Sequence, residues 1–104
     1  MPRHAFKMHL HSGNAEEYRH RHDELWPELV SLLRNTGIRH YSIFLDEETH
    51  TLFGVLDIDD PAALDELPKH LVMQRWWTYM SDIMEANTDN SPVSIPLKEV
   101  FYLP

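Results

Sequence analysis

The chain of 104 residues contains no cysteine, only three glycines and no apolar run long enough to cross a membrane. Without cysteine, disulfides, thiolate zinc sites and a cysteine nucleophile are all excluded. So few glycines disfavour a glycine-rich loop that would hold nucleotide phosphates. Basic residues are also scarce, because nine Lys and Arg stand against 17 Asp and Glu, with a formal net charge of -8. We therefore expect no nucleic acid and no membrane among the partners.

Other familiar site patterns are missing as well. No serine stands in a nucleophile-elbow sequence. Eight histidines are many for this length, but none belongs to a His-Glu-x-x-His run, so we expect no metal and no cofactor. The first residues lack the apolar core of a signal peptide. The missing cysteines fit a reducing cytoplasm.

Apolar residues recur with strand and helix periods along the whole of residues 1–104, which we expect to form a single domain. Period-2 alternation predicts four strands, at His4–Leu10, 41–45, 52–58 and Leu97–Leu103, the middle two joined as a hairpin. Helical spacing predicts three helical segments, from the N-cap Asn14 to before Gly37, from Asp60 to Leu67, and from about His70 to Met84. Pro27 lies inside the first segment, where we expect a kink or a local break.

This order is βαββαβ, the ferredoxin-like split motif of the α+β class, with helices on one face of a four-stranded antiparallel sheet. Apolar side chains are expected on both faces of that sheet: Phe6, Met8 and Leu10 on one, and Phe44, Phe53 and Phe101 on the other. A second apolar face needs a cover, so we expect a homodimer.

Trp76 and Trp77 are adjacent in the last predicted helix. Neighbouring helical residues point about 100° apart, so a one-sided core does not easily bury both rings. One indole can pack in the core, while the other, at an edge, suits a ligand that is partly apolar and partly polar, such as a sugar. The alternative is that both rings are core or subunit-contact residues.

His22 lies on the core-facing stripe of the first helical segment, within about 40° of Tyr18. An imidazole there is either a half-buried histidine with a hydrogen-bond partner or an acid–base group at a pocket. Tyr18 is either structural or a donor to a ligand hydroxyl. Tyr41 points inward on its strand and has the same two interpretations. Asp89, in a polar loop, is a turn residue or a sugar acceptor.

Four stretches across the chain resemble one known family, the L-rhamnose mutarotases. They are Glu17-Tyr18 with His22 and Leu25-Trp26-Pro27-Glu28-Leu29; Gln74-Arg75-Trp76-Trp77 with Tyr79-Met80 and Asp82; Asn87-x-Asp89-Asn90-Ser91-Pro92; and Glu99-Val100-Phe101-Tyr102-Leu103-Pro104. Residues 59–71 follow the family less closely. The resemblance implies a dimeric α+β barrel that interconverts the α and β anomers of L-rhamnose in the cytoplasm.

The resemblance also implies roles for particular residues. The family's proton donor falls on His22, and its sugar-contacting positions fall on Tyr18, Tyr41, Trp76 and Trp77. Two other functions remain open from the residues themselves. Small dimeric α+β barrels also include oxygenases, some cofactor-free and some haem-dependent, and a sugar-binding dimer without turnover would use the same aromatic residues.

Overall fold

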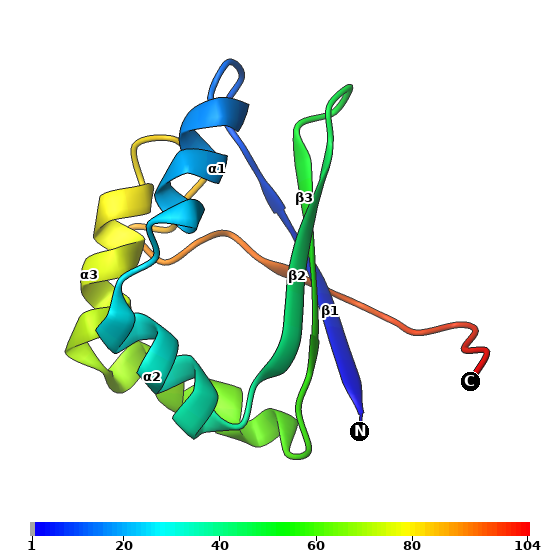
Figure 1. Cartoon of the computed structure of the whole chain (residues 1–104). Coiled ribbons are helices and arrows are strands. Elements are labelled where there is room, and N and C mark those ends of the chain that lie inside the picture. Colours follow the sequence, from blue (N-terminus) through cyan, green and yellow to red (C-terminus); the bar gives the residue numbers. More distant parts are fainter. Residues whose placement is uncertain (1) are drawn as a thin grey trace.

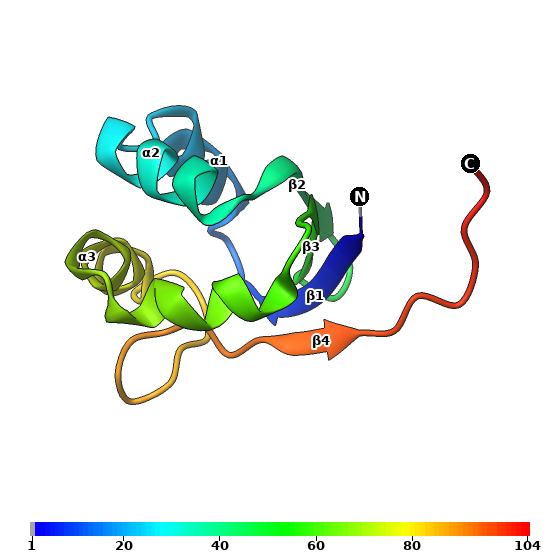
Figure 2. The same ribbon diagram turned by 90° about the horizontal axis from the view of Figure 1, so that it is seen from below.

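The computed structural model describes residues 2–104 and contains, over that range, one four-stranded sheet and four helical segments. In chain order the elements are β1 (Arg3–His9), α1 (Ala15–Asp23), α2 (Pro27–Thr36), β2 (Arg39–Asp46), β3 (Thr51–Asp57), the 3₁₀-helix η1 (Pro61–Lys69), α3 (Leu71–Met80) and β4 (Ile95–Leu97). All strand pairs are antiparallel, in the order β2-β3-β1-β4. The helices lie on one side of the sheet (Figures 1 and 2). The α+β, ferredoxin-like βαββαβ prediction is confirmed.

The core lies between the inner face of the sheet and the helices. Its fully buried members include Leu10 on the sheet side, Leu29 of α2 and Leu52 of β3. Phe6 of β1 is paired with Gly54 of β3, and a Cβ atom at position 54 would collide with the phenyl ring of Phe6. Glycine at this position therefore lets the Phe6 ring lie over the sheet, where it lines a cavity.

The predicted break at Pro27 is confirmed, and it divides the segment into two separate helices. Pro27 is the first residue of α2, where its missing N–H costs nothing. Trp26 before it is extended, with φ −62° and ψ 132°, as expected of a residue that precedes proline. The predicted N-cap is wrong in its chemistry: the Asn14 amide donates to the carbonyls of His11 and Ser12 and makes no side-chain cap bond to α1.

The predicted last strand, Leu97–Leu103, is wrong. Pairing stops at Leu97, which lies opposite Ala5 of β1. Because β1 begins at Arg3, residues beyond Glu99 have no strand beside them to pair with, and Phe101 is exposed rather than part of the sheet. Figures 1 and 2 show this C-terminal segment leaving the body of the molecule.

Two helix ends also differ from the prediction. α3 ends at Met80 rather than Met84, and the buried Met84 instead forms a bridge with Leu10. Pro68 lies inside η1 instead of ending a helix. The predicted N-cap of this segment is correct, since an Asp60 carboxylate oxygen accepts from the amide of Ala62 at 3.1 Å.

The outer face of the sheet has no helix over it and carries large apolar side chains. Phe44 is 62% exposed and lies opposite Phe53. Ile95 is 51% and Leu97 38% exposed at the β4 edge. Within residues 2–104, no helix is both long and apolar enough to cross a membrane.

Candidate active site

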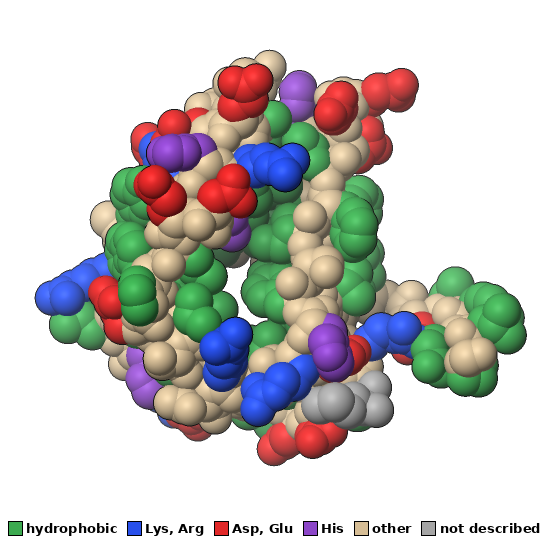
Figure 3. Space-filling model, in the orientation of Figure 1, with side chains coloured by type: hydrophobic (Ala, Val, Ile, Leu, Met, Phe, Trp, Pro, Cys, Tyr) green, Lys and Arg blue, Asp and Glu red, His purple; other side chains and the backbone are tan. Residues whose placement is uncertain are grey.

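A cavity of about 1140 Å³ lies between the inner face of the sheet and the helices. It opens to solvent, and Figure 3 shows it as a hollow with hydrophobic side chains inside. The proton donor and the four sugar-contacting residues implied by the resemblance all line it: His22, Tyr18, Tyr41, Trp76 and Trp77. Residues from α1, β2 and α3 therefore meet around one space. Its volume lies just above the usual range of small-molecule sites, about 300–1,000 Å³, so a monosaccharide would leave part of it to water.

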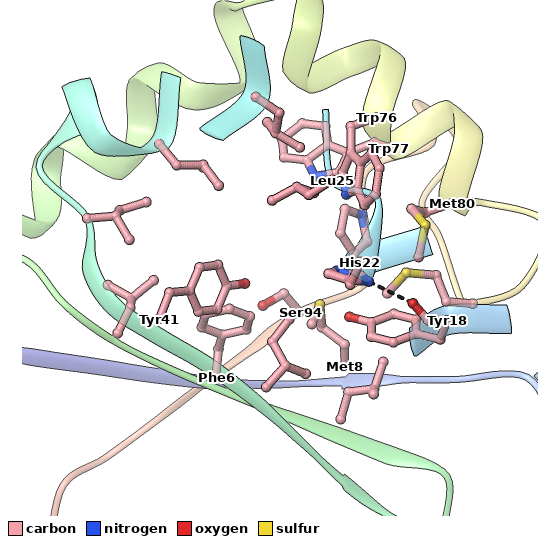
Figure 4. A pocket seen from close by; sticks show the side chains of 18 of the residues that line it. Phe6, Met8, Tyr18, His22, Leu25, Tyr41, Trp76, Trp77, Met80 and Ser94 are labelled. Carbon is pink, nitrogen blue, oxygen red and sulfur yellow. Dashed lines mark hydrogen bonds between the residues drawn. The ribbon is translucent and has the colours of Figure 1, made fainter. Parts of the chain in front are cut away.

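Tyr18 and His22 form a stacked pair one turn apart on α1. Their ring centroids are 4.3 Å apart, with planes inclined by 28°. Nδ1 of His22 lies 2.9 Å from the backbone carbonyl oxygen of Tyr18 (Figure 4). A carbonyl oxygen only accepts, so Nδ1 carries the proton and Nε2 of the neutral ring keeps its lone pair. The backbone thereby fixes both the tautomer and the orientation of the imidazole.

Burial lowers the pKa of His22 below its ordinary value of 6.5. The hydrogen bond to the Tyr18 carbonyl and the charge of Asp23 both act in the opposite direction, but burial is the larger cause. Near pH 7 the imidazole is therefore neutral, with a basic nitrogen free to accept a proton.

The two tryptophans occupy different environments. Trp76 is 6% exposed, and its ring meets His22 edge to face at 5.4 Å and Trp26 at 5.1 Å. Trp77 is half-buried and also lines the cavity. The structure thus agrees with the expectation that one ring packs in the core while the other lies at an edge. Figure 4 labels both indoles among the side chains that line the cavity.

Tyr41 enters the cavity through an irregularity in β2. Arg39 lies opposite Asp57 and Ser42 opposite Val55, so two residues of β2, one of them Tyr41, face a single residue of β3. His40 takes up the irregularity with a left-handed φ of 50°, and such a bulge re-aims a side chain.

The tyrosine hydroxyls face the cavity as hydrogen-bond donors. Tyr41 is 39% exposed because it borders the open space, yet burial raises its pKa to about 12. The pKa of Tyr18 is raised further, mainly by burial and secondly by the neighbouring Tyr41. Both phenols are therefore neutral at physiological pH. Figure 4 labels both among the side chains that line the cavity.

The sequence did not single out Ser94, whose side chain also lines the cavity (Figure 4). It lies in the irregular segment before β4, where no periodicity marks a residue as inward. Asn90 and Ser91 of the polar loop line the cavity too, whereas Asp89 accepts from the amide of Ser91 at 3.0 Å, as a turn residue does. In residues 2–104, no three His, Asp or Glu side chains gather as metal ligands would.

Fold and site together define a small ferredoxin-like α+β protein in which His22 lies among aromatic side chains that line a cavity. A family profile described as L-rhamnose mutarotase matches residues 3–103. An L-rhamnose mutarotase of Sinorhizobium fredii is 58% identical over 103 residues, 99% of either chain. One of Brucella anthropi is 57% identical over 102 residues, 98% of this chain and 96% of its own. The chain belongs to the L-rhamnose mutarotase family.

Solved structures agree with this assignment. The crystal structure of an L-rhamnose mutarotase from Formosa agariphila covers 100% of both chains with a TM-score of 0.92 and 49% identity. An antibiotic biosynthesis monooxygenase has a TM-score of 0.61 at 15% identity, over 96% of this chain and 99% of its own. At that identity the likeness concerns the fold alone.

Proposed function

We propose that this protein interconverts the α and β anomers of L-rhamnose. One observation carries the proposal: a neutral imidazole, held by a backbone carbonyl through Nδ1, lines a cavity between a phenol and an indole. Such a group can take a proton from a sugar hydroxyl and return it. The substrate is inferred from the family, of which a member 58% identical to this chain is named for this sugar.

The reaction changes no oxidation state and needs two proton transfers. Nε2 of His22 accepts the proton of the anomeric hydroxyl, and a water in the cavity gives a proton to the ring oxygen as the C1–O5 bond breaks. The imidazolium then returns its proton to the hydroxide that is left. The open aldehyde rotates about C1–C2, and the reverse steps close the ring on the other face. The phenols of Tyr18 and Tyr41, both neutral, donate hydrogen bonds to sugar oxygens. Acid–base catalysis of this kind contributes typically 10²–10⁴-fold.

In this proposal the aromatic side chains that line the cavity bind the sugar. L-Rhamnose carries a methyl group where most hexoses carry a hydroxymethyl group, and the flat face of an indole is suited to cover it. Trp77, half-buried at the cavity, has more free surface for this contact than Trp76. The proposal is thus that α1 supplies the proton transfer and α3 the apolar platform.

Saturation-transfer NMR of the anomeric protons tests the activity. The protein should speed the exchange between α- and β-L-rhamnose well above the buffer rate, with L-fucose and D-glucose exchanging more slowly. Saturable L-rhamnose binding without faster exchange would mean a binding protein, and no binding at all would exclude the proposed substrate.

We further infer that two copies pair through the outer face of the sheet. The support is the exposed apolar surface of Phe44, Ile95 and Leu97, because a monomer rarely leaves such a patch open. Light scattering at micromolar concentration should give twice the mass of 12.3 kDa, and Phe44→Glu should shift it toward the monomer. A wild-type mass equal to one chain would contradict the inference.

A cytoplasmic location is part of the same proposal. Its support is the absence of cysteine from all 104 residues, which agrees with a reducing compartment without requiring one. Fractionation of cells that make the protein from its own gene should recover it in the cytoplasmic fraction; recovery in the medium would contradict this.

A further inference from the structure

α1 carries His22 but is held poorly by apolar burial. Of the nine residues described in α1, Tyr18 is the one that is buried. A helix this short is marginal without outside support. It is also cut off from α2 by the break before Pro27. Something other than core packing must therefore set its position.

Arg21, the neighbour of His22, reaches from α1 to the end of α3. Its side chain is only 10% exposed. Nη1 donates to the carbonyl of Tyr79 at 2.7 Å and to Asp82 at 2.9 Å, and Nη2 donates to the second Asp82 oxygen at 3.3 Å. Nε donates to Glu17 of its own helix at 2.6 Å. The planar guanidinium thus connects α1 to two acceptors that lie 58 and 61 residues further along the chain.

The receiving groups suit a cation. The Tyr79 carbonyl belongs to the last turn of α3, which has no intrahelical donors left for its carbonyls and carries the negative end of the helix dipole. The guanidinium carbon also lies 4.4 Å from the centroid of the Tyr79 ring, a cation–π contact. Asp82 adds a full negative charge, and its bond to Arg21 holds the Asp82 pKa below the ordinary value.

The same two helices meet a second time at the site. Trp76 lies one turn before Tyr79 on α3, and their rings are 5.7 Å apart. Trp76 in turn meets His22 at 5.4 Å. Two adjacent residues of α1 therefore touch two residues one turn apart on α3. A single contact would let α1 pivot, whereas two contacts fix its rotation.

We propose that Arg21 is a positioning residue, an inference that rests on the proposed function. Arg21 connects α1 to the end of α3 and so holds the imidazole of His22 in place beside Trp76. It touches no substrate atom in this role. Its effect is on where Nε2 lies relative to a sugar bound against α3. Proton transfer tolerates little displacement, since a shift of about 1 Å can cost about 10²-fold in rate.

The test compares Arg21→Ala and Arg21→Lys with Arg75→Ala, an exposed arginine of α3. Arg21→Ala should lower kcat about 10²-fold and change KM less than about threefold, because the platform on α3 remains. Lysine keeps the charge without the planar fork, so Arg21→Lys should fall between wild type and alanine. Asp82→Asn should lower kcat in the same direction by less, and Arg75→Ala should match wild type.

A second readout does not depend on turnover. The His22 ring protons lie beside the Trp76 indole, so their NMR shifts report the register directly and should move in both Arg21 variants. A folded Arg21→Ala with wild-type kcat and wild-type His22 shifts overturns the proposal, whatever its melting temperature. If that variant does not fold, wild-type kcat and shifts in Arg21→Lys and Asp82→Asn overturn it. Should the wild-type protein lack mutarotase activity, the proposed function fails while these shifts still decide the role of Arg21.

Discussion

α1 and α3 are neighbouring helices that line one cavity but are built in opposite ways. α3 buries Met73, Trp76 and Met80 in the core, while α1 buries only Tyr18 among its nine described residues. The indole platform is thus part of what makes the chain fold. The imidazole stands on a polar helix positioned by hydrogen bonds and an arginine.

Because of this difference, sugar binding on α3 and proton transfer on α1 can be changed separately. A change in α3 alters the core and the platform together, so stability and KM should change together. A change at Arg21 or His22, two half-buried positions of α1, should lower the rate with little effect on folding.

The largest effect is expected for His22→Ala. Loss of the imidazole removes the acid–base contribution, so kcat should fall about 10²–10⁴-fold with the fold retained. His20→Ala is the matched control on the same helix, since its side chain is 63% exposed. Anomer-exchange NMR and thermal unfolding measure both. A wild-type rate of anomer exchange in His22→Ala would show that His22 takes no part in the proton transfer.

Trp76→Ala and Trp77→Ala should differ from each other. Trp76 is buried, so its truncation should cost about 3–5 kcal/mol of unfolding free energy as well as raising KM. Trp77 is half-buried, so its loss should raise KM at a smaller cost in stability. Urea unfolding and kinetics on the same samples make the comparison. Equal losses of stability with unchanged KM would mean that both rings serve packing alone.

Tyr41→Phe should have the smallest effect. It removes one neutral hydrogen bond, worth about 0.5–1.5 kcal/mol, so KM should rise roughly threefold to tenfold with stability unchanged. Tyr102→Phe, on the exposed C-terminal segment, is the control. If KM is the same in both variants, the Tyr41 hydroxyl does not touch the sugar.

The sequence predicted the features that follow from a regular period. A 3.6-residue repeat placed Tyr18 and His22 on one face of a helix, and they are stacked there. Alternation along β2 pointed Tyr41 inward, and it lines the cavity. The adjacent tryptophans diverge as two neighbours on a helix must.

The remaining features depend on tertiary partners. The last strand cannot run past Glu99 because its pairing partner β1 begins at Arg3, which no local pattern in residues 97–103 reveals. Arg21 looks like one more charged residue on a polar helix, since its partners Tyr79 and Asp82 lie some 60 residues further along the chain. Ser94 lines the cavity from a segment without periodicity.

The central claim is that His22 works as a neutral base on a helix of limited burial. Its pKa is lowered from 6.5, so the neutral form persists at pH values below 6.5 and is lost only as the pH falls through that lowered pKa. The pKa of Tyr41, raised to about 12, should leave the alkaline side flat to about pH 10.

One parallel titration tests this claim most directly: the His22 ring protons followed by NMR, and kcat/KM followed by anomer exchange after subtraction of the buffer rate. We predict that both give the same pKa, below 6.5, with activity lost on the acid side. An acid limb at or above 6.5, or a limb that does not follow the His22 resonances, would contradict the account.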